Sequence, residues 1–140
     1  MNDKLFIDTN VLVYYFDSDE PAKQARARTL LDSRTRARFV LSTQVLQEFY
    51  VSVTRKLAQP LAPSVAFDTV RDLMAMQIVP IDGPFILESI QLAQKTQLSL
   101  WDALVVQAAL TAGCPRLLTE DLQDGQKIGS LEIENPFRGL

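Results

Sequence analysis

Two kinds of hydrophobic pattern alternate along the chain. Short runs of consecutive apolar residues are typical of buried strands, and segments in which apolar residues recur every three or four positions are typical of amphipathic helices. The first pattern predicts strands at residues 4–8, 38–42, 78–81, 116–119 and 131–133. The second, together with the wholly apolar segment 11–16, predicts helices at residues 11–16, 22–31, 43–57, 64–76, 85–96 and 100–112.

Boundary residues support several of these elements. Pro21 stands at the first turn of the second helix, and Thr43 is placed to cap the helix that follows it. Gly113 followed by Pro115 is a helix stop signal. Pro80 has no N–H to donate to a neighbouring strand, so the strand at 78–81 is expected near an edge of the sheet.

The order of the elements favours one architecture. Strands alternate with single helices or helix pairs, which is typical of a parallel sheet covered by helices on both faces. No internal repeat or linker divides the 140 residues, and this length suits one domain with a sizeable core. We therefore expect a single domain over residues 1–140, with a three-layer α/β/α fold around a central, mostly parallel sheet.

Composition narrows the chemistry. The chain has no histidine and one cysteine, which removes Ser-His-Asp hydrolysis, His-ligated zinc and an internal disulfide. Its five glycines are too scattered for a phosphate-binding loop, and its net charge of −3 does not by itself indicate nucleic acid. The apolar runs are too short to span a membrane, and no leader is evident, so we expect a cytoplasmic protein with no membrane partner.

Four acidic residues stand where this fold would bring them together. Asp8 and Asp121 follow strands, and in a parallel sheet both would emerge at the same edge, where open α/β sheets bind ligands. Asp102 lies in the first turn of a helix, and Glu48 lies within a helix among apolar residues, facing inward or nearly so. We expect all four to line one cleft.

Clustered carboxylates repel one another, and a divalent cation relieves that repulsion. An all-oxygen ligand set suits Mg²⁺, with Mn²⁺ as a substitute, rather than zinc. Such a site can activate water and stabilise the attacking and leaving oxygens of phosphodiester hydrolysis. Asn10 and Thr119 are candidates to orient waters or the acidic side chains.

Each of these residues also has a structural interpretation. Asp8 or Asn10 could simply cap the helix that follows, and Asp102 could form a capping-box variant with Ser99. Glu48 could face solvent, and residues 119–121 could form a plain polar turn. The combination is more informative than any single residue, because all four acids fall where the fold would bring them together.

Two further features are open at this stage. Arg26, Arg28, Arg34, Arg36 and Arg38 lie within thirteen positions and form either a solvated surface or a contact for phosphate groups. Trp101, beside Asp102, is expected in the core or in an interface rather than as a platform for base stacking.

The chain resembles PIN-domain nucleases, and within them the VapC-type toxins of bacterial toxin–antitoxin pairs. The resemblance rests on four segments in order: 6–12 (Phe-Ile-Asp-Thr-Asn-Val-Leu), 47–49 (Gln-Glu-Phe), 98–104 (Leu-Ser-Leu-Trp-Asp-Ala-Leu) and 117–121 (Leu-Leu-Thr-Glu-Asp). It implies a flavodoxin-like fold, a homodimer, a small antitoxin partner and a Mg²⁺-dependent ribonuclease. It further implies metal binding at Asp8 and Asp102, with Glu48 and Asp121 completing the acidic site.

One position departs from the family pattern. Gln123 stands where the family often has a second acid two positions after Asp121, and Asp124 lies one further on. A site for a single ion is therefore plausible. In this hypothesis Asp121 binds the ion directly or through water, and Glu48 binds a second ion or orients the attacking water.

The sequence thus predicts a Mg²⁺-dependent endoribonuclease that is the toxin of a toxin–antitoxin pair. One alternative is a catalytically inactive PIN-like module that binds RNA or protein. Another is a Mg²⁺-dependent phosphatase on a similar sheet. That chemistry commonly has a second acid two residues after its nucleophilic Asp, and Asn10 in that place counts against it.

Overall fold

A single six-stranded sheet organises the protein in this computed structural model, which describes residues 2–33 and 38–140. The strand order is β3-β2-β1-β4-β6-β5. All neighbours are parallel except β5 and β6, which are antiparallel. The strands are β1 (Leu5–Ile7), β2 (Phe39–Ser42), β3 (Gln77–Val79), β4 (Arg116–Leu118), β5 (Lys127–Ile128) and β6 (Leu131–Glu134).

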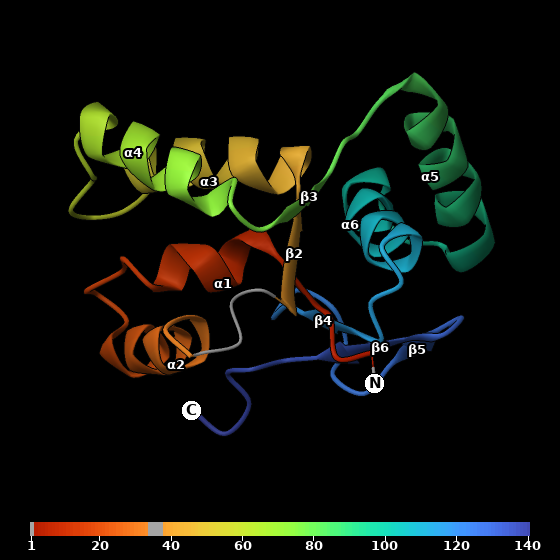
Figure 1. Cartoon of the computed structure of the whole chain (residues 1–140). Coiled ribbons are helices and arrows are strands. Elements are labelled where there is room, and N and C mark those ends of the chain that lie inside the picture. Colours follow the sequence, from red (N-terminus) through yellow and green to blue (C-terminus); the bar gives the residue numbers. More distant parts are fainter. Residues whose placement is uncertain (1, 34–37) are drawn as a thin grey trace.

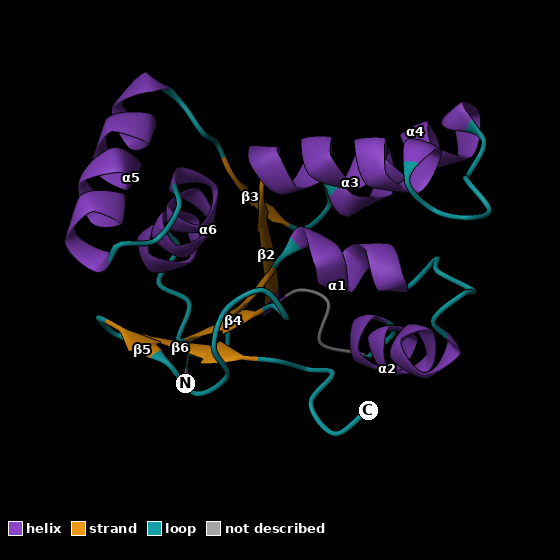
Figure 2. Cartoon of the chain, turned by 180° about the vertical axis from the view of Figure 1, so that it is seen from behind, coloured by secondary structure: helices purple, strands orange, loops and turns teal. Residues whose placement is uncertain are grey.

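Helices cover both faces of this sheet. Figure 1 shows α5 and α6 together on one side of the central strands, and α1 to α4 gathered on the other. Both views place α1 between α3 and α2 (Figures 1 and 2). The helices are α1 (Thr9–Tyr14), α2 (Pro21–Leu31), α3 (Thr43–Arg55), α4 (Pro63–Leu73), α5 (Gly83–Thr96) and α6 (Leu100–Thr111). The predicted three-layer α/β/α fold with a mostly parallel sheet is confirmed.

At β1, in the centre of the sheet, the order in which successive strands are added reverses. The chain runs from β1 outward through β2 to β3, and then crosses to the other side of β1 to form β4. In open α/β sheets a crevice forms at the carboxyl ends of the strands on either side of such a switch point. Ile7 is level with Leu118 in the pairing of β1 with β4. The residues that follow these two strands, Asp8 and Thr119, therefore emerge side by side.

The hydrophobic core fixes the position of these strand ends. Phe6, Ile7, Leu117 and Leu118 are all buried, and Phe49 of α3 packs in the same cluster. Full burial of an apolar side chain of this size contributes roughly 1.5–3 kcal/mol. Strands this short are held by such packing on both faces as well as by their hydrogen bonds, so the core determines where Asp8 and Thr119 stand.

Several predicted boundaries differ from the structure, and two of them are instructive. The N-cap of α3 is Ser42 rather than Thr43, because the Ser42 side chain accepts a hydrogen bond from the N–H of Val45 at 3.2 Å. Thr43 Oγ1 instead accepts from the N–H of Ile81 at 3.1 Å. Strand β3 ends at Val79, before Pro80. Its position at the edge of the sheet is confirmed, since it pairs with β2 alone.

The C-terminal hairpin of β5 and β6 was predicted only in part. Strand β6 was expected, but the two residues of β5 are too few to show a hydrophobic period. The strands pair through Ile128 and Leu131, and the turn between them uses Gly129 with φ +58°, a left-handed conformation that favours glycine. Among the described residues, no helix combines the length and apolarity that crossing a membrane requires.

Candidate active site

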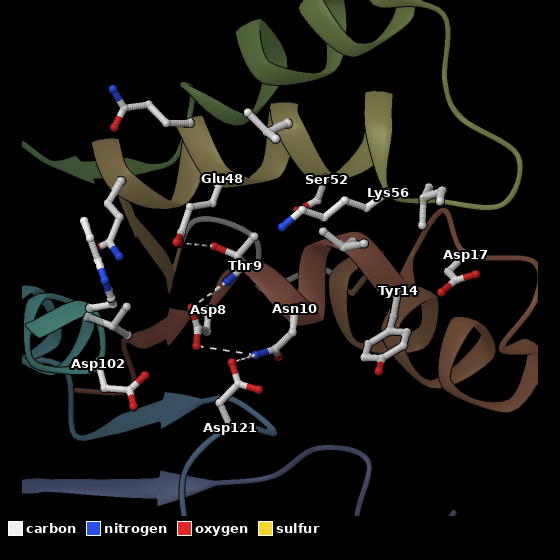
Figure 3. A pocket seen from close by; sticks show the side chains of 17 residues that line it. Asp8, Thr9, Asn10, Tyr14, Asp17, Glu48, Ser52, Lys56, Asp102 and Asp121 are labelled. Atoms are coloured by element: carbon white, nitrogen blue, oxygen red, sulfur yellow. Dashed lines mark hydrogen bonds between the residues drawn. The ribbon is translucent and has the colours of Figure 1, made fainter. Parts of the chain in front are cut away.

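A cleft of about 660 Å³ opens at the carboxyl ends of β1 and β4. All four acids predicted from the sequence, Asp8, Glu48, Asp102 and Asp121, line it. Figure 3 shows their side chains directed into the same space from four separate parts of the chain. The structure therefore brings together the residues that the sequence placed at one sheet edge.

Asp8 lies at the base of this cleft and is also the N-cap of α1. Its side chain is only 7% exposed. One carboxylate oxygen accepts from the N–H of Thr9 at 2.8 Å, and the other accepts from Thr119 Oγ1 at 2.8 Å and from Asn10 Nδ2 at 3.4 Å. The capping interpretation of Asp8 is correct, but the cap uses one oxygen and leaves the second facing the other site residues.

The environment of Asp8 disfavours its charge. Burial is the main cause that raises its pKa, from 3.8 to about 6, and the nearby carboxylates of Asp121 and Glu48 raise it further. Hydrogen bonds from Thr119 and from the backbone of Thr9 act in the opposite direction. The site thus contains a buried carboxylate whose ionisation any bound cation would favour.

Asn10 and Thr119 connect Asp8 with Asp121. Asn10 Nδ2 lies 3.0 Å from Asp121 Oδ2 and 3.2 Å from Thr119 Oγ1. Thr119 is fully buried, and its hydroxyl accepts from the backbone N–H of Asp121 at 3.1 Å while donating to Asp8. The cap of α1 is Asp8, so Asn10 does not have that role; its amide instead bridges two carboxylates.

Glu48 is exposed rather than turned into the core, so the expectation that it faces inward is wrong. It still reaches the cleft, where Oε1 accepts a hydrogen bond from Thr9 Oγ1 at 3.0 Å. Leu46 and Phe49, its apolar neighbours on α3, are buried. Glu48 itself lies at the rim of the cleft, where its carboxylate is exposed to solvent.

Asp102 is half-buried and stands in the first turn of α6. Its backbone N–H donates to Ser99 Oγ at 3.1 Å, which confirms half of the predicted capping box. Its carboxylate accepts no hydrogen bond from the described residues and points into the cleft (Figure 3). The cap fixes the start of the helix, and the side chain remains available for a ligand.

The electrostatic character of the cleft is strongly acidic. Among the described residues the charged groups that line it are five carboxylates and one ammonium: Asp8, Asp17, Glu48, Asp102, Asp121 and Lys56. No three carboxylates of the described residues are spaced closely enough to hold a metal ion by themselves. Mg²⁺ usually keeps several waters and uses only one or two carboxylates, so the donor chemistry of the cleft suits a hydrated Mg²⁺.

A buried side chain in the wall of the cleft has an unused acceptor. Gln44 lies one helical turn before Glu48 on α3 and is 8% exposed. Its Oε1 atom has no hydrogen-bond partner among the described residues. An orphaned buried acceptor is costly and usually indicates a water or another polar ligand. The hydrophobic pattern of α3 did not predict this feature.

A second feature that the sequence did not predict is a set of contacts made by Glu120, which holds the loop that carries Asp121. Glu120 accepts from Tyr14 Oη at 2.6 Å and forms an ion pair with Lys23 at 3.0 Å. Burial and the Glu120 carboxylate both raise the pKa of Tyr14, which keeps the phenol protonated as a donor. These contacts tie the segment between Thr119 and Asp121 to α1 and α2, across about a hundred residues of sequence.

The three described arginines of the cluster at 26–38 have structural partners and do not line the cleft. Arg26 donates to the carbonyl of Pro136 at 2.7 Å, Arg28 to the carbonyl of Tyr15 at 3.0 Å, and Arg38 pairs with Asp3 at 2.7 Å. None of the three lines the cleft.

Arg34 and Arg36 lie outside the described residues. An attraction of the RNA backbone by these arginines stays a prediction, and the three that the structure describes do not line the cleft.

Trp101 differs from the expectation of a core position. It is 65% exposed and lines the cleft beside Asp102. Leu104 and Val105 of α6 are buried, whereas Trp101, one turn earlier, lies at the rim of the cleft. Trp101 is the one tryptophan of the chain, so its fluorescence can report on this end of the cleft.

Comparison with known proteins identifies the family. A sequence model of the PIN domain matches residues 5–124, so the chain belongs to the PIN domain family. The predicted resemblance to this family is confirmed. No curated protein sequence matches the chain.

Solved structures of similar fold are toxins of toxin–antitoxin systems. A toxin–antitoxin complex from Klebsiella pneumoniae has a TM-score of 0.68 and 24% identity, over 96% of this chain and 98% of that chain. VapC20 of Mycobacterium tuberculosis, described as a sarcin-ricin loop cleaving toxin, has a TM-score of 0.67 and 16% identity, over 81% and 87%. DNA-bound VapBC of Salmonella typhimurium has a TM-score of 0.63 and 20% identity, over 96% and 98%. At these identities the likeness concerns the fold.

Proposed function

We propose that the protein is a Mg²⁺-dependent endoribonuclease and the toxin of a toxin–antitoxin pair. The observation that carries this proposal is the meeting of Asp8, Glu48, Asp102 and Asp121 in one cleft at the switch point of a PIN fold. Among the described residues, no histidine or cysteine lines the cleft. The proposed chemistry therefore uses carboxylates, water and a bound cation.

The cation fits because the residues favour one. Asp8 is buried beside two further carboxylates, and Gln44 presents an orphaned acceptor to which a metal-bound water could donate. We assign Asp8, Asp102 and Asp121 as the residues that hold Mg²⁺, directly or through water, with Mn²⁺ as a substitute. When bound, the cation supplies an activated water and stabilises charge on the phosphate oxygens.

The remaining residues have positioning roles in this proposal. Thr119 and Asn10 hold the carboxylates of Asp8 and Asp121 in fixed orientation through the hydrogen bonds described above. Glu48 accepts a proton from the attacking water or orients it, at the exposed rim where water is available. Polyanionic RNA meets five carboxylates in the metal-free cleft, so its binding there depends on the cation.

A protein partner is part of the proposal. Structures of similar fold include complexes of toxins with antitoxins. Several large apolar side chains are exposed on this chain, among them Phe67 (62%) and Leu87 (66%). Single exposed apolar residues are normal on protein surfaces, so the antitoxin is proposed from the structures of similar fold and the homodimer from the resemblance to VapC-type toxins.

Cleavage of total cellular RNA tests the function. The purified protein, freed of any antitoxin, is incubated with RNA in Mg²⁺ and in excess chelator. Asp8→Asn is the inactive variant, and Asp82→Asn is its matched control, because Asp82 is also an N-cap, of α5, but lies outside the cleft. We expect discrete fragments in Mg²⁺ from the wild type and from Asp82→Asn, and none from Asp8→Asn. Intact RNA with every folded protein would favour a binding module instead.

A further inference from the structure

Lys56 is the one cationic residue among the described residues that line the acidic cleft. Lys56 lines the cleft and is exposed, and it forms no hydrogen bond or ion pair with the described residues. Lys23, on α2, differs because it forms an ion pair with Glu120 at 3.0 Å. An ammonium group left free beside an acidic site is available for an anion that belongs to the substrate.

The geometry of α3 determines where this charge lies. Glu48, Ser52 and Lys56 are four residues apart, so they follow one face of the helix and all three line the cleft. A rise of 1.5 Å per residue puts the Cα atoms of Glu48 and Lys56 about 12 Å apart along the axis. Figure 3 shows the Lys56 side chain running back along α3 toward Ser52. The ammonium thus lies beyond the acids, on the same wall.

We propose that Lys56 binds an RNA phosphate that flanks the scissile one. The Cα atoms of Glu48 and Lys56 are about 12 Å apart along the helix axis, so a phosphate bound at Lys56 lies on the same wall of the cleft, beyond the position of Glu48. The phosphate at Lys56 is therefore a neighbour of the one that meets the acids. The inference rests on the proposed function, because it defines the substrate of that same cleft.

The proposal defines the substrate class. A substrate must carry at least one phosphate beyond the bond that is cut, which favours cleavage inside an oligonucleotide over hydrolysis of a dinucleotide or a phosphomonoester. The contact acts on binding, since Lys56 stands away from Asp8 and Asp102. Its loss should raise KM and leave kcat almost unchanged.

Binding of labelled oligouridylates provides the test. Fluorescence anisotropy in Mg²⁺ compares a hexamer with the dinucleotide UpU, in a Glu48→Gln background that prevents cleavage and keeps the three proposed Mg²⁺ ligands. The variants are Lys56→Met, Lys56→Arg and the matched control Arg55→Met. Arg55 is the preceding residue, is exposed and does not line the cleft. Its substitution removes an equal charge from the same end of α3.

We expect Lys56→Met to weaken hexamer binding about three- to fivefold, as for one exposed ion pair. The slope of log affinity against log salt should fall by about 0.7, the value for one phosphate contact with a single strand. Lys56→Arg should restore both, and Arg55→Met should change neither. UpU, which has no flanking phosphate, should bind equally well to all variants.

Other results would overturn the proposal. Equal effects of Lys56→Met and Arg55→Met would show only a general loss of positive charge. An equal loss for UpU and the hexamer would place Lys56 at the scissile phosphate instead, and a hexamer that does not bind would remove the site. Lys56-dependent binding together with uncleaved cellular RNA would refute the proposed nuclease and leave the phosphate contact intact.

Discussion

Replacing Asp8 by Asn should stabilise the metal-free protein at neutral pH. The native pKa of Asp8 is about 6, against 3.8 for an unperturbed Asp, and a difference of about 2 pKa units corresponds to about 3 kcal/mol. The native state binds more protons than the unfolded state between these values, so stability falls as pH rises from about 4 to 6 and is constant above. Asn has no charge to bury.

The variant also alters hydrogen bonds. Asn keeps one acceptor oxygen, so either the bond from the N–H of Thr9 or that from the hydroxyl of Thr119 is lost, at a cost of about 1 kcal/mol. The expected net gain of Asp8→Asn at pH 7.5 is therefore about 2 kcal/mol. Near pH 4 the variant should be slightly less stable than the wild type.

Urea denaturation in excess chelator, followed by circular dichroism at pH 4 to 8, measures both quantities. The stability difference between Asp8→Asn and the wild type should grow by about 3 kcal/mol across this range. Asp82→Asn removes the same charge from an exposed cap and should show no such gain. A difference that does not vary with pH, or a variant less stable at pH 7.5, would refute the argument that burial of Asp8 opposes its charge.

Further substitutions test other parts of the site and the fold. Mg²⁺ should raise the Tm of the wild type but not of Asp8→Asn, and differential scanning calorimetry with and without chelator measures this. Thr119→Val removes a hydrogen bond that lowers the pKa of Asp8, so the stability loss of the metal-free protein with rising pH should extend to higher pH. Ser42→Ala removes the cap of α3 and should cost about 1 kcal/mol in urea titrations. Glu120→Ala frees the Asp121 loop from α1 and α2, and should raise the Mg²⁺ concentration for half-maximal change in Trp101 fluorescence about tenfold.

Much of the fold was predictable because its signals are local. Apolar runs bounded by polar residues and by Pro or Gly marked the five strands that the structure shows in parallel pairing, and the edge position of β3 followed from Pro80. Helix boundaries were less predictable. Ser42 and Thr43 each carry a hydroxyl that can cap a helix, and only the position at which β2 ends determines that Ser42 caps α3. Strand β5 was not predicted because a strand of two residues is too short to show an alternation of apolar and polar positions.

The acids were predictable for a different reason. Their positions at strand ends and at a helix start have defined places in a parallel sheet, so the topology alone brings Asp8 and Asp121 together. The contacts between them were not predictable, because they join residues about 110 positions apart through side-chain rotamers. Asn10 as a bridge and Glu120 as an anchor of the site loop both depend on such contacts.

The hydrogen bonds around Asp8 show what the sequence uses to hold this arrangement together. Three donors converge on its carboxylate, and one of them, the hydroxyl of the fully buried Thr119, also fixes the backbone of Asp121. These bonds reduce the penalty of burying the charge but do not remove it, since the pKa stays above its ordinary value. A fold under no functional demand would place an apolar or neutral residue at this position. In the proposed function a bound cation would offset this penalty, so the feature that weakens the metal-free protein would favour binding of the metal.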